Sequence, residues 1–225
     1  KGSKFKVKYN GDNKVNLVNK NKTLKISEVK NVDRGYAINL NPFRKDDNQI
    51  VIEVPNIKLN ELKGYSKNSS YYIKNINSKN MNLINYSNPI TLNSVNVENS
   101  DVNSYATHFN INNSILKNAN FNIEKGFISV SKSDISNSIF LLGSGNISFN
   151  KMSPRNDIKA STKKGDIYYS YKDKPENTLL KLQPGKGKSI IENKHFHESK
   201  VGKSDNILEF YTVDGDIAVS YTHLT

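Results

Sequence analysis

The stretch Gly165-Asp166-Ile167-Tyr168-Tyr169 shows the pattern that decides the fold, a turn residue followed by apolar residues two and four positions later. The pattern returns at turn residues spaced 19, 19, 19, 19, 20, 22 and 28 positions apart. These anchor residues are Ser69, Asn88, Thr107, Gly126, Gly145, Gly165, Gly187 and Gly215. Only Ser189, two positions after its anchor, breaks the apolar series. The chain therefore contains an internal repeat.

The alternation also runs upstream of the anchors, where positions minus seven, minus five and minus three form a second set. Before Gly126 these positions hold Ala119, Phe121 and Ile123. A period of two predicts a strand with one buried face, and glycine supplies the positive φ of the turn between two strands. A third apolar position recurs at Ile76, Val95, Ile115 and Ile135. Each repeat is therefore expected to have three short sides.

Repeats of this length, with strands as their units, are typical of a β-solenoid in which neighbouring coils bury each other's inner face. The alternative is a β-sandwich, which also has many short strands. A sandwich has no reason to keep a 19-residue register over five consecutive anchors. We therefore predict an all-β solenoid of about eight coils.

The expected domain organisation is an N-terminal strand-rich cap or small sheet over residues 1–60, followed by solenoid repeats over 61–225. Polar inserts at 172–178 and 194–206 lengthen two repeats and are expected to form loops. Five strand-like runs occupy the N-terminal part: Phe5–Val7, Val15–Val18, Thr23–Ile26, Tyr36–Leu40 and Ile50–Val54. A cap would hide the unpaired edge of the first coil.

The composition suits a narrow core, with 35% hydrophobic residues and a mean hydropathy of −0.66. Asparagine occurs 35 times. Stacked asparagines can form side-chain ladders between coils, but an AT-rich genome would also favour Asn and Lys over Arg, which occurs only at positions 34, 44 and 155. Both explanations stay open. No cysteine is present, which excludes disulfides and thiolate metal sites.

The net charge of +12 comes from lysines scattered along the whole chain. They can form a solvated surface that keeps strand edges from pairing. They can instead attract a polyanion, such as anionic lipid headgroups, an anionic wall polymer or nucleic acid. Nucleic acid is the least favoured, since no helix-turn-helix, zinc-finger or RNP-like pattern is present. No stretch reaches 18 consecutive apolar residues, so no transmembrane segment is expected.

Two short motifs suggest chemistry, and both have simpler explanations. Gly185-Lys186-Gly187-Lys188-Ser189 resembles the end of a phosphate-binding loop, but Leu182 stands where that loop needs its first glycine. We interpret it as a solenoid turn. His195 and His197 have the spacing of metal ligands on one strand face, with Glu192 or Glu198 as a third ligand. Their loop context favours a pair of surface histidines, and no metal or cofactor is predicted.

Two outward aspartates raise the question of glycan cleavage, which needs converging carboxylates. Asp166 and Asp216 follow their anchor glycines directly. Counted in sequence order they lie two coils apart, too far for a shared site. Each is expected to accept hydrogen bonds from its own turn backbone. We therefore predict no catalytic residues and no enzyme activity, with a polysaccharide-cleaving β-helix as a less favoured alternative.

In the order of its motifs, the chain resembles a bacterial family of adhesin-type β-strand-repeat domains (Gly-Asp-Ile repeats) of unknown function. The resemblance rests on Thr23-Leu24-Lys25-Ile26, on Ile50–Pro55 and on the Gly-x-Ile units that end in two Gly-Asp-Ile motifs. It implies a right-handed β-solenoid on the outer side of a bacterial membrane, behind an N-terminal membrane anchor. This chain departs from the family pattern by lacking glycine at Ser69, Asn88 and Thr107.

The function expected from these observations is that of a non-catalytic module on the cell surface, an adhesin or a binding module. The expected partner is an anionic polymer, a lipid surface or another protein. Envelope-stress sensing is the alternative function that the resemblance implies.

Overall fold

The computed structural model describes residues 5–11, 13–29 and 49–221. Contacts divide the chain between Ile57 and Lys58 into two compact units. In the first unit, β1 (Lys6–Asn10) pairs antiparallel with β4 (Gln49–Glu53), and β2 (Lys14–Lys20) pairs antiparallel with β3 (Thr23–Val29). Four of the five strand-like runs thus form strands, and the fifth, at 36–40, lies outside the described residues.

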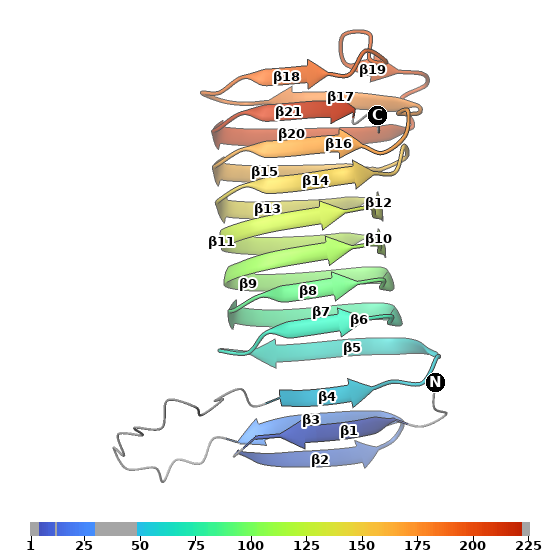
Figure 1. Ribbon diagram of the computed structural model, residues 1–225, viewed down its shortest axis with the longest axis vertical. Coiled ribbons are helices and arrows are strands. Elements are labelled where there is room, and N and C mark those ends of the chain that lie inside the picture. Colours follow the sequence, from blue (N-terminus) through green and yellow to red (C-terminus); the bar gives the residue numbers. More distant parts are fainter. Residues whose placement is uncertain (1–4, 12, 30–48, 222–225) are drawn as a thin grey trace. The chain divides into compact units, whose positions relative to one another are not determined.

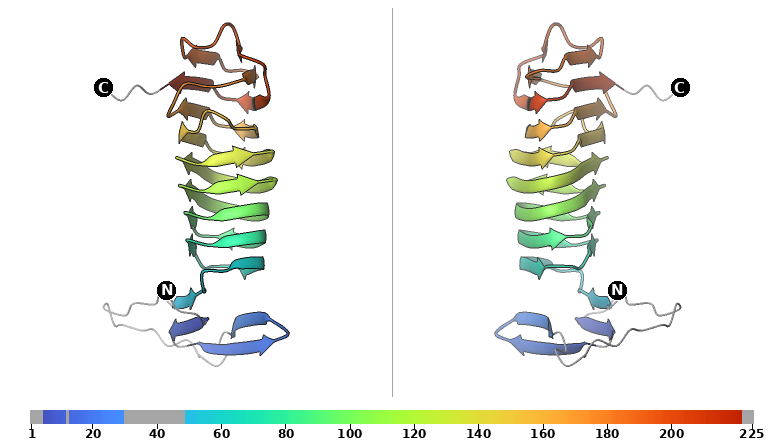
Figure 2. Two further views of the ribbon diagram at one scale, coloured as in Figure 1. Left: turned by 90° about the vertical axis from the view of Figure 1, so that its right-hand side faces the viewer. Right: turned by 90° about the vertical axis from the view of Figure 1, so that its left-hand side faces the viewer.

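The second unit is a β-solenoid, which confirms the predicted fold class, and its described residues contain no helix (Figures 1 and 2). We call its two long sides sheet A and sheet B. Sheet A stacks, in spatial order, β5 (Lys58–Ser66), β7 (Asn77–Ser87), the first part of β9 (Asn96–Asn112), the first part of β11 (Ala119–Ser131), β13 (Ser138–Ser144), β15 (Ile158–Lys164), β20 (Asn206–Asp214) and β17 (Thr178–Gln183).

Sheet B continues the same layers after the corner turn. It stacks β6 (Tyr71–Lys74), β8 (Ile90–Asn93), the ends of β9 and β11, β14 (Ile147–Met152), β16 (Ile167–Tyr171), β21 (Ile217–Tyr221) and β18 (Ser189–Glu192). A short third side holds β10 (Ile115–Lys117) and β12 (Asp134–Ser136). All these pairings are parallel, and within the described residues each of the two long sides stacks eight layers. β19 (Lys200–Val201) pairs antiparallel with β17.

The predicted inward positions form the core. The upstream sets that precede Gly126, Gly145, Gly165 and Gly215 are all buried, and so are the residues two and four positions after these anchors. Aromatic rings stack along the lumen with centroids 4.6 Å apart for Phe121 and Phe140. The repeat works because a residue 19 or 20 positions later returns to the same place on the next layer.

The corner between the two sheets explains the anchor glycines. Gly126, Gly145, Gly165 and Gly215 have φ between +127° and +157°. A Cβ on Gly145 would lie 1.7 Å from the Gly126 carbonyl oxygen, because successive corners stack directly on each other. Glycine is therefore required here by both backbone conformation and space.

The predicted third apolar column was wrong at one position. Ile115 points outward and is 42% exposed, whereas Leu116 takes the inward place between Val97 and Ile135. Val95 and Val97 belong to two different inward columns, and a step of 19 residues leads from them to Ser114 and Leu116, so Ile115 lies between the two. A shift of one residue exchanges the inner and outer faces of a strand.

The order of the last layers also differs from the sequence order. β20 and β21, the last strands that the structure describes, lie between the layer of β15 and β16 and the layer of β17 and β18. The terminal layer therefore contains Ser189, which is exposed and has no further layer to pack against. This position explains why Ser189 breaks the apolar series.

Asparagine ladders between layers are present on the outside of the solenoid. Each Nδ2 donates to the Oδ1 of the asparagine one layer below, over 3.1 Å from Asn99 to Asn80, 3.2 Å from Asn118 to Asn99, and 2.7 Å from Asn137 to Asn118. The ladder explanation thus holds for these four asparagines. Part of the asparagine content has a structural role.

Candidate functional site

The glycine- and lysine-rich segment is a corner of the solenoid, as interpreted from the sequence. Gly187 donates its backbone N–H to the Pro184 carbonyl over 2.9 Å, and strand β18 follows directly. Phosphate-binding loops of the type considered open a helix, and none begins here.

The two histidines do not share a strand face, so that part of the prediction was wrong. The His197 N–H donates to the Lys200 carbonyl over 3.1 Å in a turn, and the His195 ring meets the edge of Tyr221 at 5.5 Å. Between them Phe196 is only 8% exposed and packs against Tyr171. Within the described ranges, no group of three or more His, Cys, Asp or Glu side chains could hold a metal ion.

Asp166 and Asp216 are neighbours in space, which corrects the prediction that two coils separate them. Their strands pair directly, since β16 and β21 are adjacent. Asp216 donates its N–H to Asp166 Oδ1 over 2.8 Å, and Lys188 donates its N–H to Asp216 Oδ1 over 2.7 Å. The carboxylates therefore connect successive layers instead of capping their own turns.

The second oxygen of Asp166 is also engaged. The Tyr168 hydroxyl donates to Asp166 Oδ2 over 2.9 Å, and this hydrogen bond raises the pKa of Tyr168 because ionisation would place two negative charges side by side. Both Asp166 oxygens thus serve structural hydrogen bonds. Asp166 and Asp216 thus form a ladder in which each carboxylate accepts a backbone N–H from the adjacent layer, and this ladder stabilises the corner.

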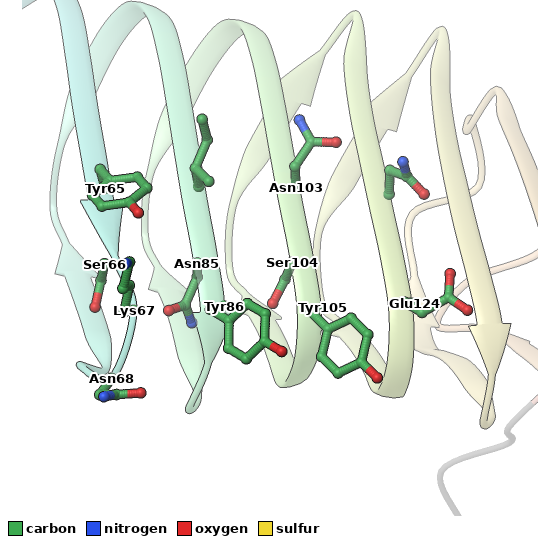
Figure 3. A pocket seen from close by; sticks show the side chains of 12 residues that line it. Tyr65, Ser66, Lys67, Asn68, Asn85, Tyr86, Asn103, Ser104, Tyr105 and Glu124 are labelled. Atoms are coloured by element: carbon green, nitrogen blue, oxygen red, sulfur yellow. The ribbon is translucent and has the colours of Figure 1, made fainter.

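The strongest candidate for a binding site is a groove of about 810 Å³ on the outside of sheet A, which we call the tyrosine groove (Figure 3). It crosses the first four layers, from β5 to β11. One row of lining residues consists of Tyr65, Ile84, Asn103 and Asn122, and the other consists of Lys67, Tyr86, Tyr105 and Glu124. Since each row takes one residue from each layer, the groove runs along the stacking direction.

Three tyrosines, Tyr65, Tyr86 and Tyr105, form the aromatic part of the groove. The rings of Tyr86 and Tyr105 are stacked, with centroids 5.0 Å apart and planes inclined by 10°, and they lie side by side in Figure 3. Tyr65 is 69% exposed at the first layer. The Lys125 ammonium lies 5.4 Å from the centroid of the Tyr105 ring and donates to its hydroxyl over 3.4 Å. The rings are thus ordered by stacking and by a cation–π contact.

Two buried polar side chains also line the tyrosine groove. Asn85 is 2% exposed and donates Nδ2 to the Asn88 carbonyl over 2.8 Å, which stabilises the corner turn. Asn85 Oδ1 and Ser104 Oγ have no hydrogen-bond partner among the described residues. Both residues hold the inward minus-three position of their repeat, so these polar atoms lie on the lumen side of sheet A and do not face a ligand in the groove.

The tyrosine groove was not predicted from the sequence. Its signal is the outward position two residues before each anchor, which holds Lys67, Tyr86, Tyr105 and Glu124 in successive repeats. Attention to the inward positions alone leaves this column unnoticed. Stacking in register brings these outward residues together just as it brings the core residues together.

Comparison with protein-family models gives a match over nearly the whole chain. The family model described as Toastrack DUF4097 matches residues 1–220. No curated protein and no solved structure matches the chain. Among the residues that the structure describes, no helix is long and apolar enough to cross a membrane.

Proposed function

The chain belongs to the Toastrack DUF4097 family of domains of unknown function, and from this premise we propose that it is a non-catalytic binding module of the bacterial cell envelope. Its ligand is an anionic polymer that contains sugar rings. The polymer lies in the tyrosine groove, parallel to the stacking direction. The observation that carries this proposal is the ordered pair Tyr86 and Tyr105 beside a groove that crosses four layers.

The shape of the tyrosine groove favours a linear ligand. Layers of a β-sheet repeat about every 4.8 Å, so four layers offer roughly 14 Å of continuous groove. The exposed aromatic rings can pack against the C–H faces of sugar rings, while Asn103 and Asn122 offer amide donors and acceptors opposite them. A polymer with regularly spaced rings suits a site built from regularly spaced side chains.

Charge supports an anionic ligand. Lys67 lines the first layer of the groove and Glu124 the fourth, and Lys125 lies beside Tyr105, so two lysines stand against one carboxylate. The whole chain carries a net charge of +12, which attracts polyanions from a distance and makes their binding depend on ionic strength. Rings and charges together distinguish the proposed polymer from a neutral glycan and from a lipid surface.

A binding titration with purified anionic wall polysaccharide tests the proposal. We expect binding that weakens as salt is added, and a roughly tenfold or larger loss in the double variant Tyr86→Ala/Tyr105→Ala. The matched control is Tyr72→Ala, which removes a 66% exposed tyrosine from sheet B. Equal binding by the double variant and the control would exclude the tyrosine groove as the site.

Vesicles of anionic lipid serve as the second probe in the same titration. We expect the double variant to bind such vesicles as the unchanged chain does, because a planar surface cannot enter the groove. Binding to vesicles but not to the polysaccharide would overturn the proposal in favour of a lipid surface.

A further inference from the structure

The terminal layer of the solenoid is covered on one side only. In sheet A, β17 is followed by β19, which pairs with it at Thr178 and Leu179. In sheet B, β18 pairs with β21 through one edge. No strand within the described part of the chain pairs with the other edge of β18, which lies in the topmost layer in Figure 1. In the layer beyond β17 and β18, β19 therefore covers the sheet A side, and no described strand covers the sheet B side.

The free edge of β18 presents backbone groups to solvent. Ile217 donates its N–H to the Lys188 carbonyl over 2.9 Å, so the backbone of Lys188 faces β21. Because backbone groups alternate in direction along a strand, the N–H and C=O groups of Ser189 and Ile191 point to the free edge. Such a row of groups is complementary to another extended backbone.

The core is also incomplete at this edge. Ile191 pairs with Val219 in the inward column, where Val219 is 0% exposed. Ile191 itself is 36% exposed because no layer lies over it. An apolar side chain on an added strand would bury this surface and continue the core by one layer.

A hollow of about 570 Å³ lies at the end of β18 and contains an unsatisfied donor. It is lined by Ile191, Asn193 and Phe196, among others. Asn193 is 5% exposed, and its Oδ1 accepts a hydrogen bond from the His195 N–H over 3.1 Å. Its Nδ2 finds no acceptor among the described residues. A buried amide in this state matches a carbonyl oxygen supplied from outside.

The geometry points to β-strand addition: the free edge of β18 takes up an extended segment of a partner protein. The segment places an apolar residue over Ile191 and a carbonyl oxygen within reach of Asn193 Nδ2. One strand fits this half-layer beside β19. A second copy of the chain fits less well, because each copy has its own β19 in the layer above β17.

The test uses the whole chain and a synthetic peptide with the sequence of Asp214–Tyr221, the segment that already pairs with the other edge of β18. We expect saturable binding, with the largest NMR shifts at the amides of Ser189 and Ile191. Hydrogen exchange at these two amides should slow in the complex. Shifts elsewhere with none at β18 would overturn the inference.

Three variants locate the binding. Ile191→Lys places a charge in the inward column of the free edge and should weaken binding at least tenfold, whereas Ile190→Lys changes an outward, 41% exposed neighbour and should not. Asn193→Asp keeps Oδ1 as an acceptor, removes the Nδ2 donor and should weaken binding. Thermal unfolding of each variant checks that it is folded.

Two further outcomes would contradict the inference. Binding of the peptide by Ile191→Lys as strongly as by the unchanged chain would place the site elsewhere. A concentration-dependent dimer in light scattering, lost in Ile191→Lys, would assign the edge to a second copy instead of a partner protein. Neither outcome depends on the tyrosine groove, so this inference and the proposed function can fail separately.

Discussion

At the level of single residues, the alternation of inward and outward side chains is sharp, as Ile147 and its neighbour Asn146 show. Its side chain is 0% exposed, and its strand neighbours are Ile128 and Ile167, which lie inward on the adjacent layers. The adjacent Asn146 points outward, and its Oδ1 accepts the N–H of Asp166 over 2.9 Å. Two consecutive residues thus have opposite environments.

The same substitution by aspartate at these two positions should therefore have very different effects on stability. Ile147→Asp should destabilise the domain by about 4 kcal/mol or more, because it buries a charge without a partner. Asn146→Asp should cost about 1 kcal/mol or less, since its carboxylate still accepts the Asp166 N–H. Thermal unfolding measures both. Similar melting temperatures would contradict the inward register.

Two tyrosines, Tyr71, which is partly buried, and Tyr169, which is fully buried, make the fold sensitive to alkali. Burial raises the pKa of Tyr71 from 10.0 to about 12, and burial also raises the pKa of Tyr169. The unfolded chain ionises first, so the stability that these hydroxyls contribute is complete below pH 10 and is lost as pH rises through about 12. Tyr71→Phe should lose less stability over this window in denaturant titrations. An unchanged loss would show that the pKa of Tyr71 is not raised in the folded state.

At the scale of elements, the asparagine ladder stabilises neighbouring layers. Asn118 takes part in two ladder bonds, and its φ of 46° lies in the left-handed region. Asn118→Ala should therefore cost about 1–3 kcal/mol, from lost hydrogen bonds and a strained backbone. The control Asn120→Ala, at an exposed position on β11, should cost less than about 0.5 kcal/mol. Equal costs in urea unfolding would show that the ladder does not stabilise the fold.

The sequence was most informative about elements that repeat. A period of two and an anchor spacing of 19 identify the inward residues, because equivalent positions in every layer face the same narrow core. The tyrosine groove depends on outward residues such as Tyr86, which no packing constraint selects. The sequence did not predict that Asp166 and Asp216 lie on adjacent layers. The anchor spacings of 22 and 28 residues give the lengths of the repeats but not the order in which the layers stack.

At the scale of the whole molecule, the layer order connects the fold with both proposals. The first four layers form the tyrosine groove, and the out-of-order last layers leave β18 with a free edge. Because β20 lies inside the stack, it is paired on both edges, with β15 on one side and with β17 on the other. The chain therefore completes its core only after its final strands have been inserted.

Disulfide formation between introduced cysteines tests this order most directly, since the chain has no cysteine of its own. Glu209 lies between Lys159 and Lys181 on neighbouring strands of sheet A. Adjacent strands about 4.8 Å apart permit a disulfide, whereas positions two layers apart exceed the limit of about 7 Å. We predict rapid crosslinking of Lys159→Cys with Glu209→Cys and none of Lys159→Cys with Lys181→Cys. The reverse result would show stacking in sequence order and contradict the structure on which the account rests.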